Sequence, residues 1–221
     1  MYSVAEENYI KSIYHLQQHD DNVTTNELAD RLRTKPASVT DMLKKLEAKR
    51  LLTYEKYYGC RLTNKGRKLA LAIIRRHRLW EYFLSEKLGF GWEEVHEIAE
   101  QLEHVQSAAL TEKLDAFLGH PQFDPHGDPI PDGEGRMAAQ AHIPLQDWPL
   151  ATAGIISAVA GQQEGLLEIL DRKQLGIGTA LSVQQVYAFD GSLDLLLADG
   201  QLVNVSGQLA KHLLIKKTGK G

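Results

Sequence analysis

Apolar residues near the start of the chain recur at the three- and four-residue spacing of amphipathic helices. This spacing predicts one helix over residues 4–18 and a second helix after a short polar turn, with Thr24 or Thr25 as its N-cap. Pro36 fits the first turn of a third helix over residues 36–49. The short turn between the second and third helices is typical of a helix-turn-helix motif.

The pattern changes within residues 51–63 to two β-rich runs around a tight turn. A hairpin at this place after a helix-turn-helix is the wing of a winged helix. Helical spacing then returns and predicts a long helix over about residues 64–87, followed by helices over residues 92–111 and 112–118.

Prolines and glycines between Pro121 and Pro131 end the helical pattern, and we expect a linker over residues 136–150. From Ala151 the chain shows short alternating runs with glycine-rich turns and one helix over Gln163–Arg172, typical of a small β barrel. The predicted fold is therefore mainly α with a small β part. It has three domains, over residues 1–63, 64–135 and 151–221.

Composition fits a globular protein, because 43% of the 221 residues are apolar and 24% are charged. A single cysteine, Cys60, cannot form a disulfide within the chain, and no segment resembles a signal peptide or a membrane span. We therefore expect a cytoplasmic protein with no membrane partner.

Charge is unevenly distributed behind the formal net charge of −4. Residues 1–76 hold 15 Lys and Arg against 9 Asp and Glu, residues 77–150 hold 4 against 14, and residues 151–221 hold 6 against 6. Residues 35–68 alone hold 10 basic and 3 acidic side chains, as phosphate binding requires. The basic first domain is thus a candidate for nucleic-acid binding, although a solvated basic face would look the same.

The acidic segment of residues 77–150 holds six of the nine histidines, several of them one helical turn from a glutamate. Imidazole and carboxylate are ligands for divalent first-row metals, and four-residue steps let two side chains of one helix reach one ion. The alternative for any single pair is a surface ion pair. The candidate set comprises His77 with Glu81, and His96 with Glu100, Glu103 and His104.

These residues resemble the DtxR-like metal-dependent transcriptional repressors, including their manganese-responsive MntR-like branch. The resemblance spans residues 4–132, and the last 70 residues are more loosely similar to the SH3-like (FeoA-type) domain of the longer members. The matching segments are Ile13-Tyr14, Lys35 to Thr40, Tyr54 to Gly59, Leu62 to Gly66, Arg76 to Leu79, Val95-His96, Glu103 to Val105 and Asp124 to Pro131.

The resemblance implies a winged helix-turn-helix, a helical metal-binding and dimerisation domain, and a C-terminal SH3-like β barrel. It also implies two metal sites. The primary site would use Glu100, Glu103, His104 and the residue at position 8, here Asn8, and the ancillary site would use His77, Glu81 and His96, with Glu164 as a third-domain substitute.

Two departures from the family pattern bear on the primary site. Asn8 stands where relatives often have Met or Asp, and Lys11 stands where the manganese branch places a second carboxylate. A charged lysine cannot ligate a metal, so we expect two separate mononuclear sites. Glu100 replaces the Cys of iron-type members and favours Mn²⁺, with Fe²⁺ as the second candidate.

The predicted DNA contacts lie on the third helix and on the wing. Donors on the helix can reach phosphates, Ala37 can touch a thymine methyl group, and Asp41 can accept from a cytosine or favour the helix dipole. Wing residues are expected at the DNA backbone. The set is Lys35, Ala37, Ser38, Thr40, Asp41, Lys56, Tyr57 and Arg61.

We therefore predict a homodimeric repressor that binds double-stranded operator DNA, takes a metal ion as co-repressor and controls metal-ion uptake genes. It would be no enzyme and would have no organic small-molecule substrate. One alternative is a winged-helix regulator that ignores metal. The other is a metal-dependent hydrolase, which the lack of a His-Glu-x-x-His motif disfavours.

Overall fold

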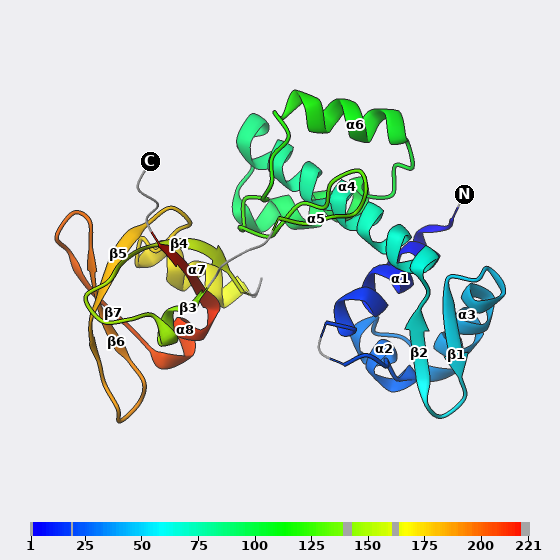
Figure 1. The fold of residues 1–221 in the computed structure, drawn as a ribbon, viewed down its shortest axis with the longest axis horizontal. Coiled ribbons are helices and arrows are strands. Elements are labelled where there is room, and N and C mark those ends of the chain that lie inside the picture. Colours follow the sequence, from blue (N-terminus) through cyan, green and yellow to red (C-terminus); the bar gives the residue numbers. More distant parts are fainter. Residues whose placement is uncertain (1, 19, 139–142, 161–163, 218–221) are drawn as a thin grey trace. The chain divides into compact units, whose positions relative to one another are not determined.

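A computed structural model describes residues 2–18, 20–138, 143–160 and 164–217 (Figure 1). In the described ranges, no helix combines the length and the apolar character needed to cross a membrane. The chain forms two compact units. The first comprises Met1–Leu84, His96–Gln122 and Ile130–Met137, and the second comprises Ser85–Val95, Phe123–Pro129 and Ala138–Gly221.

The first unit begins with the three predicted helices, α1 (Val4–Leu16), α2 (Thr25–Arg31) and α3 (Pro36–Ala48). Thr24, not Thr25, is the N-cap of α2, and it forms a capping box with Glu27. The apolar faces of these helices make a common core in which Ile10, Ile13, Leu28, Leu43 and Leu46 are fully buried. This packing confirms the helix-turn-helix that the spacing predicted.

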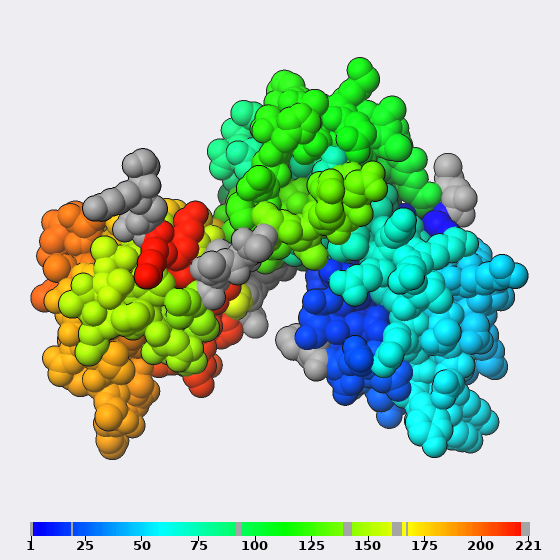
Figure 2. Space-filling view, viewed as in Figure 1, coloured from blue at the N-terminus to red at the C-terminus, as the bar shows by residue number. Residues whose placement is uncertain are grey.

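The predicted wing is also present, as an antiparallel hairpin of β1 (Leu52–Glu55) and β2 (Gly59–Leu62). Gly59 has φ +112, and a Cβ there would lie 2.4 Å from the carbonyl oxygen of Val23. Only glycine accommodates that turn and that close approach. The tip of the hairpin stands out from the neighbouring helices (Figure 2).

The middle of the chain forms α4 (Asn64–Leu88), α5 (Trp92–Leu102) and α6 (Ala108–Phe117). The prediction of one helix over residues 92–111 was wrong, because α5 ends before Glu103 and Ser107 caps a new helix by accepting from the amide of Leu110. Glu103 and His104 therefore lie in the turn between α5 and α6.

The second unit contains a six-stranded antiparallel sheet in the order β3-β8-β4-β5-β6-β7, consistent with an SH3-like domain. Its helices are α7 (Glu164–Arg172) and α8 (Gly207–His212), the latter not predicted. The strands are β3 (Ile143–Pro144), β4 (Ala153–Val159), β5 (Ala180–Val186), β6 (Leu193–Leu197), β7 (Leu202–Val205) and β8 (Leu213–Lys217).

The sheet includes residues that the sequence placed in a linker. Within the expected linker 136–150, β3 pairs with β8, and Leu145 of the short 3-10 helix η1 (Leu145–Asp147) is fully buried beside Trp148 in the core of the second unit. The sheet of this unit thus begins before Ala151. Local sequence carries no sign of this pairing, because the partner strand lies about 70 residues further along.

Candidate metal centre

His77 and Glu81 on α4 and His96 on α5 form a cluster whose ligand atoms all lie within 4.8 Å of one another. Glu81 Oε1 is 2.9 Å from His77 Nε2 and 3.0 Å from His96 Nδ1, and the two histidine nitrogens are 3.1 Å apart. Two imidazoles and a carboxylate converging in this way fit the ligand preference of a divalent first-row metal.

His77 also contacts a second carboxylate with its other ring nitrogen. Its Nδ1 lies 2.6 Å from Oε2 of Glu103, which is 0% exposed. Burial alone would lower the pKa of His77, but its hydrogen bonds to Glu103 and Glu81 outweigh burial and raise that pKa to about 9. A carboxylate on one nitrogen of a metal-binding histidine fixes the ring so that the other nitrogen faces the ion.

Glu103 in turn binds the side chain of Lys11 from α1. Lys11 Nζ lies 2.7 Å from Oε1 and 2.8 Å from Oε2 of Glu103. Burial would raise the pKa of Glu103, but the hydrogen bond from His77 and the positive charge of Lys11 lower it. Glu103 is therefore an ionised, buried carboxylate that joins α1 to α4.

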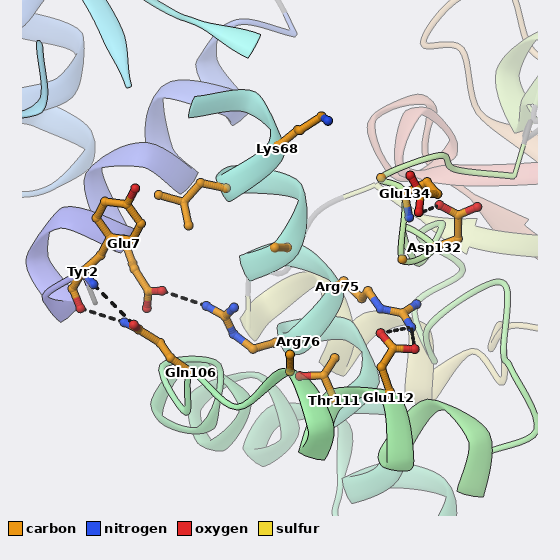
Figure 3. A pocket seen from close by; sticks show the side chains of 15 residues that line it. Tyr2, Glu7, Lys68, Arg75, Arg76, Gln106, Thr111, Glu112, Asp132 and Glu134 are labelled. Atoms are coloured by element: carbon orange, nitrogen blue, oxygen red, sulfur yellow. Dashed lines mark hydrogen bonds and ion pairs between the residues drawn. The ribbon is translucent and has the colours of Figure 1, made fainter. Parts of the chain in front are cut away.

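His104 receives a contact from α1 that the sequence did not predict. Its Nδ1 lies 2.6 Å from Oε2 of Glu7, which is 1% exposed. Glu7 also accepts from Arg76 Nη2 at 2.8 Å (Figure 3). The available signal was the four-residue spacing of Glu7 and Lys11, which puts both on one face of α1.

The predicted primary ligands are less compact than the ancillary set. Glu100 is 53% exposed and lies 3.6 Å from His96 Nε2 and 3.7 Å from Lys11 Nζ. Oε1 of Glu103 is 3.7 Å from His104 Nε2. In the described part of the chain, Glu100, Glu103 and His104 do not all lie within the 4.8 Å that defines the ancillary group.

The structure does not test the two remaining predicted ligands. Asn8 is half-buried beside Glu7, and its side chain makes no hydrogen bond to any residue that the structure describes. Glu164 is the first residue of α7, and its side chain lies outside the described residues. Both stay predictions.

The predicted DNA contacts surround one face of the winged helix. Lys35, Ala37, Ser38 and Asp41 are exposed at the start of α3, whereas the hydroxyl of Thr40 donates to the carbonyl of Pro36. On the wing Tyr57 is exposed beneath Lys56, and Arg61 pairs with Asp21 at 3.3 Å.

Between α3 and the wing lies a groove of about 550 Å³ that the sequence did not reveal. Its lining includes three polar residues within α2 and α3 that the sequence did not single out as DNA contacts and that only tertiary packing brings beside the wing. They are Thr25, Asn26 and Lys44.

Comparison with known proteins agrees with both parts of the first unit. Residues 1–60 match the family model "Iron dependent repressor, N-terminal DNA binding domain", and residues 63–132 match "Iron dependent repressor, metal binding and dimerisation domain".

Relatives and solved structures extend this match. The chain is 34% identical over 143 residues to the iron-dependent repressor IdeR of Mycobacterium leprae, covering 63% of this chain and 62% of that protein. It is 39% identical over 118 residues to the transcriptional regulator MntR of Geobacillus kaustophilus, covering 53% and 83%. The matched segments span between 52% and 62% of the IdeR and diphtheria toxin repressor relatives.

Among solved structures, a manganese-dependent transcriptional repressor in complex with manganese superposes with a TM-score of 0.82 at 32% identity. That match covers 96% of this chain and 99% of the other, so it includes the second unit.

Proposed function

The chain belongs to the iron-dependent repressor family, and from this premise we propose that it is a cytoplasmic, metal-dependent repressor of metal-ion uptake genes. The family is one of DNA-binding repressors and not of enzymes, in agreement with the expectation from sequence. The proposed partners are double-stranded operator DNA and a second copy of the chain.

The observation that carries the proposal is the pair of contacts that α1 makes with Glu103 and His104, two of the predicted metal ligands. His77, Glu81 and His96 would hold one ion, and Glu103, His104 and Glu100 would supply ligands for another. A bound divalent cation would supply a positive charge that draws these carboxylates and imidazoles together. Mn²⁺ is the proposed ion and Fe²⁺ the second candidate, since similar proteins are named for one or the other.

The same contacts explain how metal could govern DNA binding. Glu7 and Lys11 belong to α1, which packs in the core of the winged helix, and both touch residues of the turn after α5. A change in the charge of that turn therefore acts directly on an element of the DNA-binding domain. By linkage, an effector that favours one orientation of this domain typically changes affinity by about 1–3 kcal/mol.

The DNA surface is proposed to be the start of α3 together with the wing. Lys35, Ser38 and Lys56 would contact phosphates, and the groove between α3 and β1 would receive the duplex. The excess of basic side chains over residues 35–68 predicts that binding weakens steeply with salt.

A mobility-shift experiment tests the proposal. Purified protein is titrated onto fragments of promoter DNA from its own genome with MnCl₂, with FeCl₂ under anaerobic conditions, or with a chelator. We expect a shifted band only with metal. Equal binding with and without chelator would refute metal control and favour a regulator that ignores metal.

A further inference from the structure

Lys11 occupies an unusual position for a lysine, among side chains that serve as metal ligands. Its side chain is only 15% exposed, and its ammonium contacts both oxygens of Glu103. The same ammonium lies 3.7 Å from Glu100 Oε1. The Glu100 carboxylate on α5 and the Glu103 carboxylate in the turn after α5 thus both lie close to the charge of Lys11.

We propose that Lys11 is an internal competitor for metal, whose ammonium holds the Glu100 and Glu103 carboxylates and restricts them to a single divalent ion. This inference rests on the proposed metal-dependent function. It concerns how many metal ions these carboxylates bind and the metal concentration at which the ions bind.

The first step is geometric. A cation held within hydrogen-bonding distance of both oxygens of one carboxylate takes the position of an ion bound by both oxygens. An incoming metal must therefore displace the ammonium from at least one oxygen of Glu103, which is fully buried and has no access to bulk water. The contact with Lys11 thus weakens metal binding at Glu103.

Charge gives the second step. Glu100 and Glu103 together carry two negative charges, and Lys11 already balances one of them. One divalent ion leaves this group with a net positive charge, and a second would add to the repulsion among cations around the buried Glu103 carboxylate. A carboxylate at position 11 would instead add a third negative charge, which would favour binding of a second divalent ion.

The third step concerns the covalent attachment of Lys11 to α1. Lys11 cannot diffuse away, because α1 is fixed in the core of the winged helix by neighbours such as Ile10 and Ile13. The ammonium therefore competes at a constant local concentration that no change in the medium removes. Such a competitor sets a fixed metal threshold.

The test is Mn²⁺ binding to the full chain, followed by calorimetry, by metal analysis after gel filtration and by electron paramagnetic resonance. Lys11→Met keeps the length of the side chain and removes its charge, so the dissociation constant for Mn²⁺ should fall roughly tenfold. Lys11→Glu should bind one more ion per chain and show the exchange-coupled spectrum of two neighbouring Mn²⁺ ions.

Two further variants keep the result interpretable. Lys11→Arg retains the charge and should match the wild type in number of ions, and an additional ion in this variant would overturn the proposal. Lys113→Met removes an exposed lysine of α6 and should leave Mn²⁺ binding unchanged. Circular dichroism shows whether each variant is folded.

The outcomes separate this inference from the proposed function. If the wild type binds Mn²⁺ and neither Lys11→Met nor Lys11→Glu changes the affinity or the number of ions, only the role of Lys11 is overturned. If the wild type and all variants bind no Mn²⁺, the metal-dependent function is overturned together with it.

Discussion

Replacing Glu7 by Gln tests the link between α1 and the proposed metal ligands. Glu7 is buried and connects His104 at 2.6 Å with Arg76 at 2.8 Å, so the substitution removes a charge from a desolvated group of three side chains. Glutamine keeps the size of the side chain and one acceptor oxygen, so the packing around position 7 is preserved.

The expected loss in the free energy of unfolding follows from the burial of Glu7. Breaking a buried ion pair costs about 3–5 kcal/mol when the remaining charge has no other partner. Arg76 keeps a hydrogen bond to the carbonyl of Glu103, so we expect a loss of about 2 kcal/mol in the free energy of unfolding. Loss of the carboxylate behind a ligating histidine should weaken Mn²⁺ binding by about ten- to a hundredfold.

The neighbouring Glu6 supplies a matched control. It is equally buried, but it pairs with Lys45 and Lys49 of the α3 region and does not contact His104. Glu6→Gln should therefore lower stability and leave the Mn²⁺ affinity unchanged. Urea unfolding and calorimetric titration with MnCl₂ measure the two quantities, and an equal change of Mn²⁺ affinity in both variants would refute the role given to Glu7.

Three further predictions concern other parts of the first unit. Glu103→Ala and His104→Ala should each abolish Mn²⁺-dependent DNA binding while gel filtration still shows a dimer, and a monomeric product would point to a structural role instead. Burial and the charges of neighbouring arginines lower the pKa of His15 from 6.5 to about 4, so between these values the unfolded chain binds a proton that the folded chain does not. Stability should then fall as the pH drops through this range, and thermal melts of His15→Gln should show a weaker fall than those of the wild type. Gly66→Ala would place a Cβ 1.9 Å from the carbonyl oxygen of Leu51, so urea unfolding should show a loss of about 2–3 kcal/mol, and an unchanged midpoint would contradict the packing described.

The elements whose signals are local could be predicted from the sequence alone. Apolar spacing and a capping threonine at position 24 or 25 predicted the helices of the winged helix, and a glycine in a β-rich run predicted the wing. The four-residue step between His77 and Glu81 is enough to place these two proposed ligands on one face of α4. These features depend on neighbours within a few residues, and so they can be recognised from sequence.

The contacts between side chains far apart in the sequence could not be predicted, because they depend on how the helices pack. The contacts of Glu7 with His104 and of Lys11 with Glu103 join residues more than 90 positions apart, and no local spacing specifies such pairs. The break between α5 and α6 likewise places Glu103 and His104 in a turn. The apolar pattern predicted one continuous helix here, whereas Ser107 caps a new helix. Burial makes these pairings necessary, since a carboxylate that the fold removes from water must be paired there.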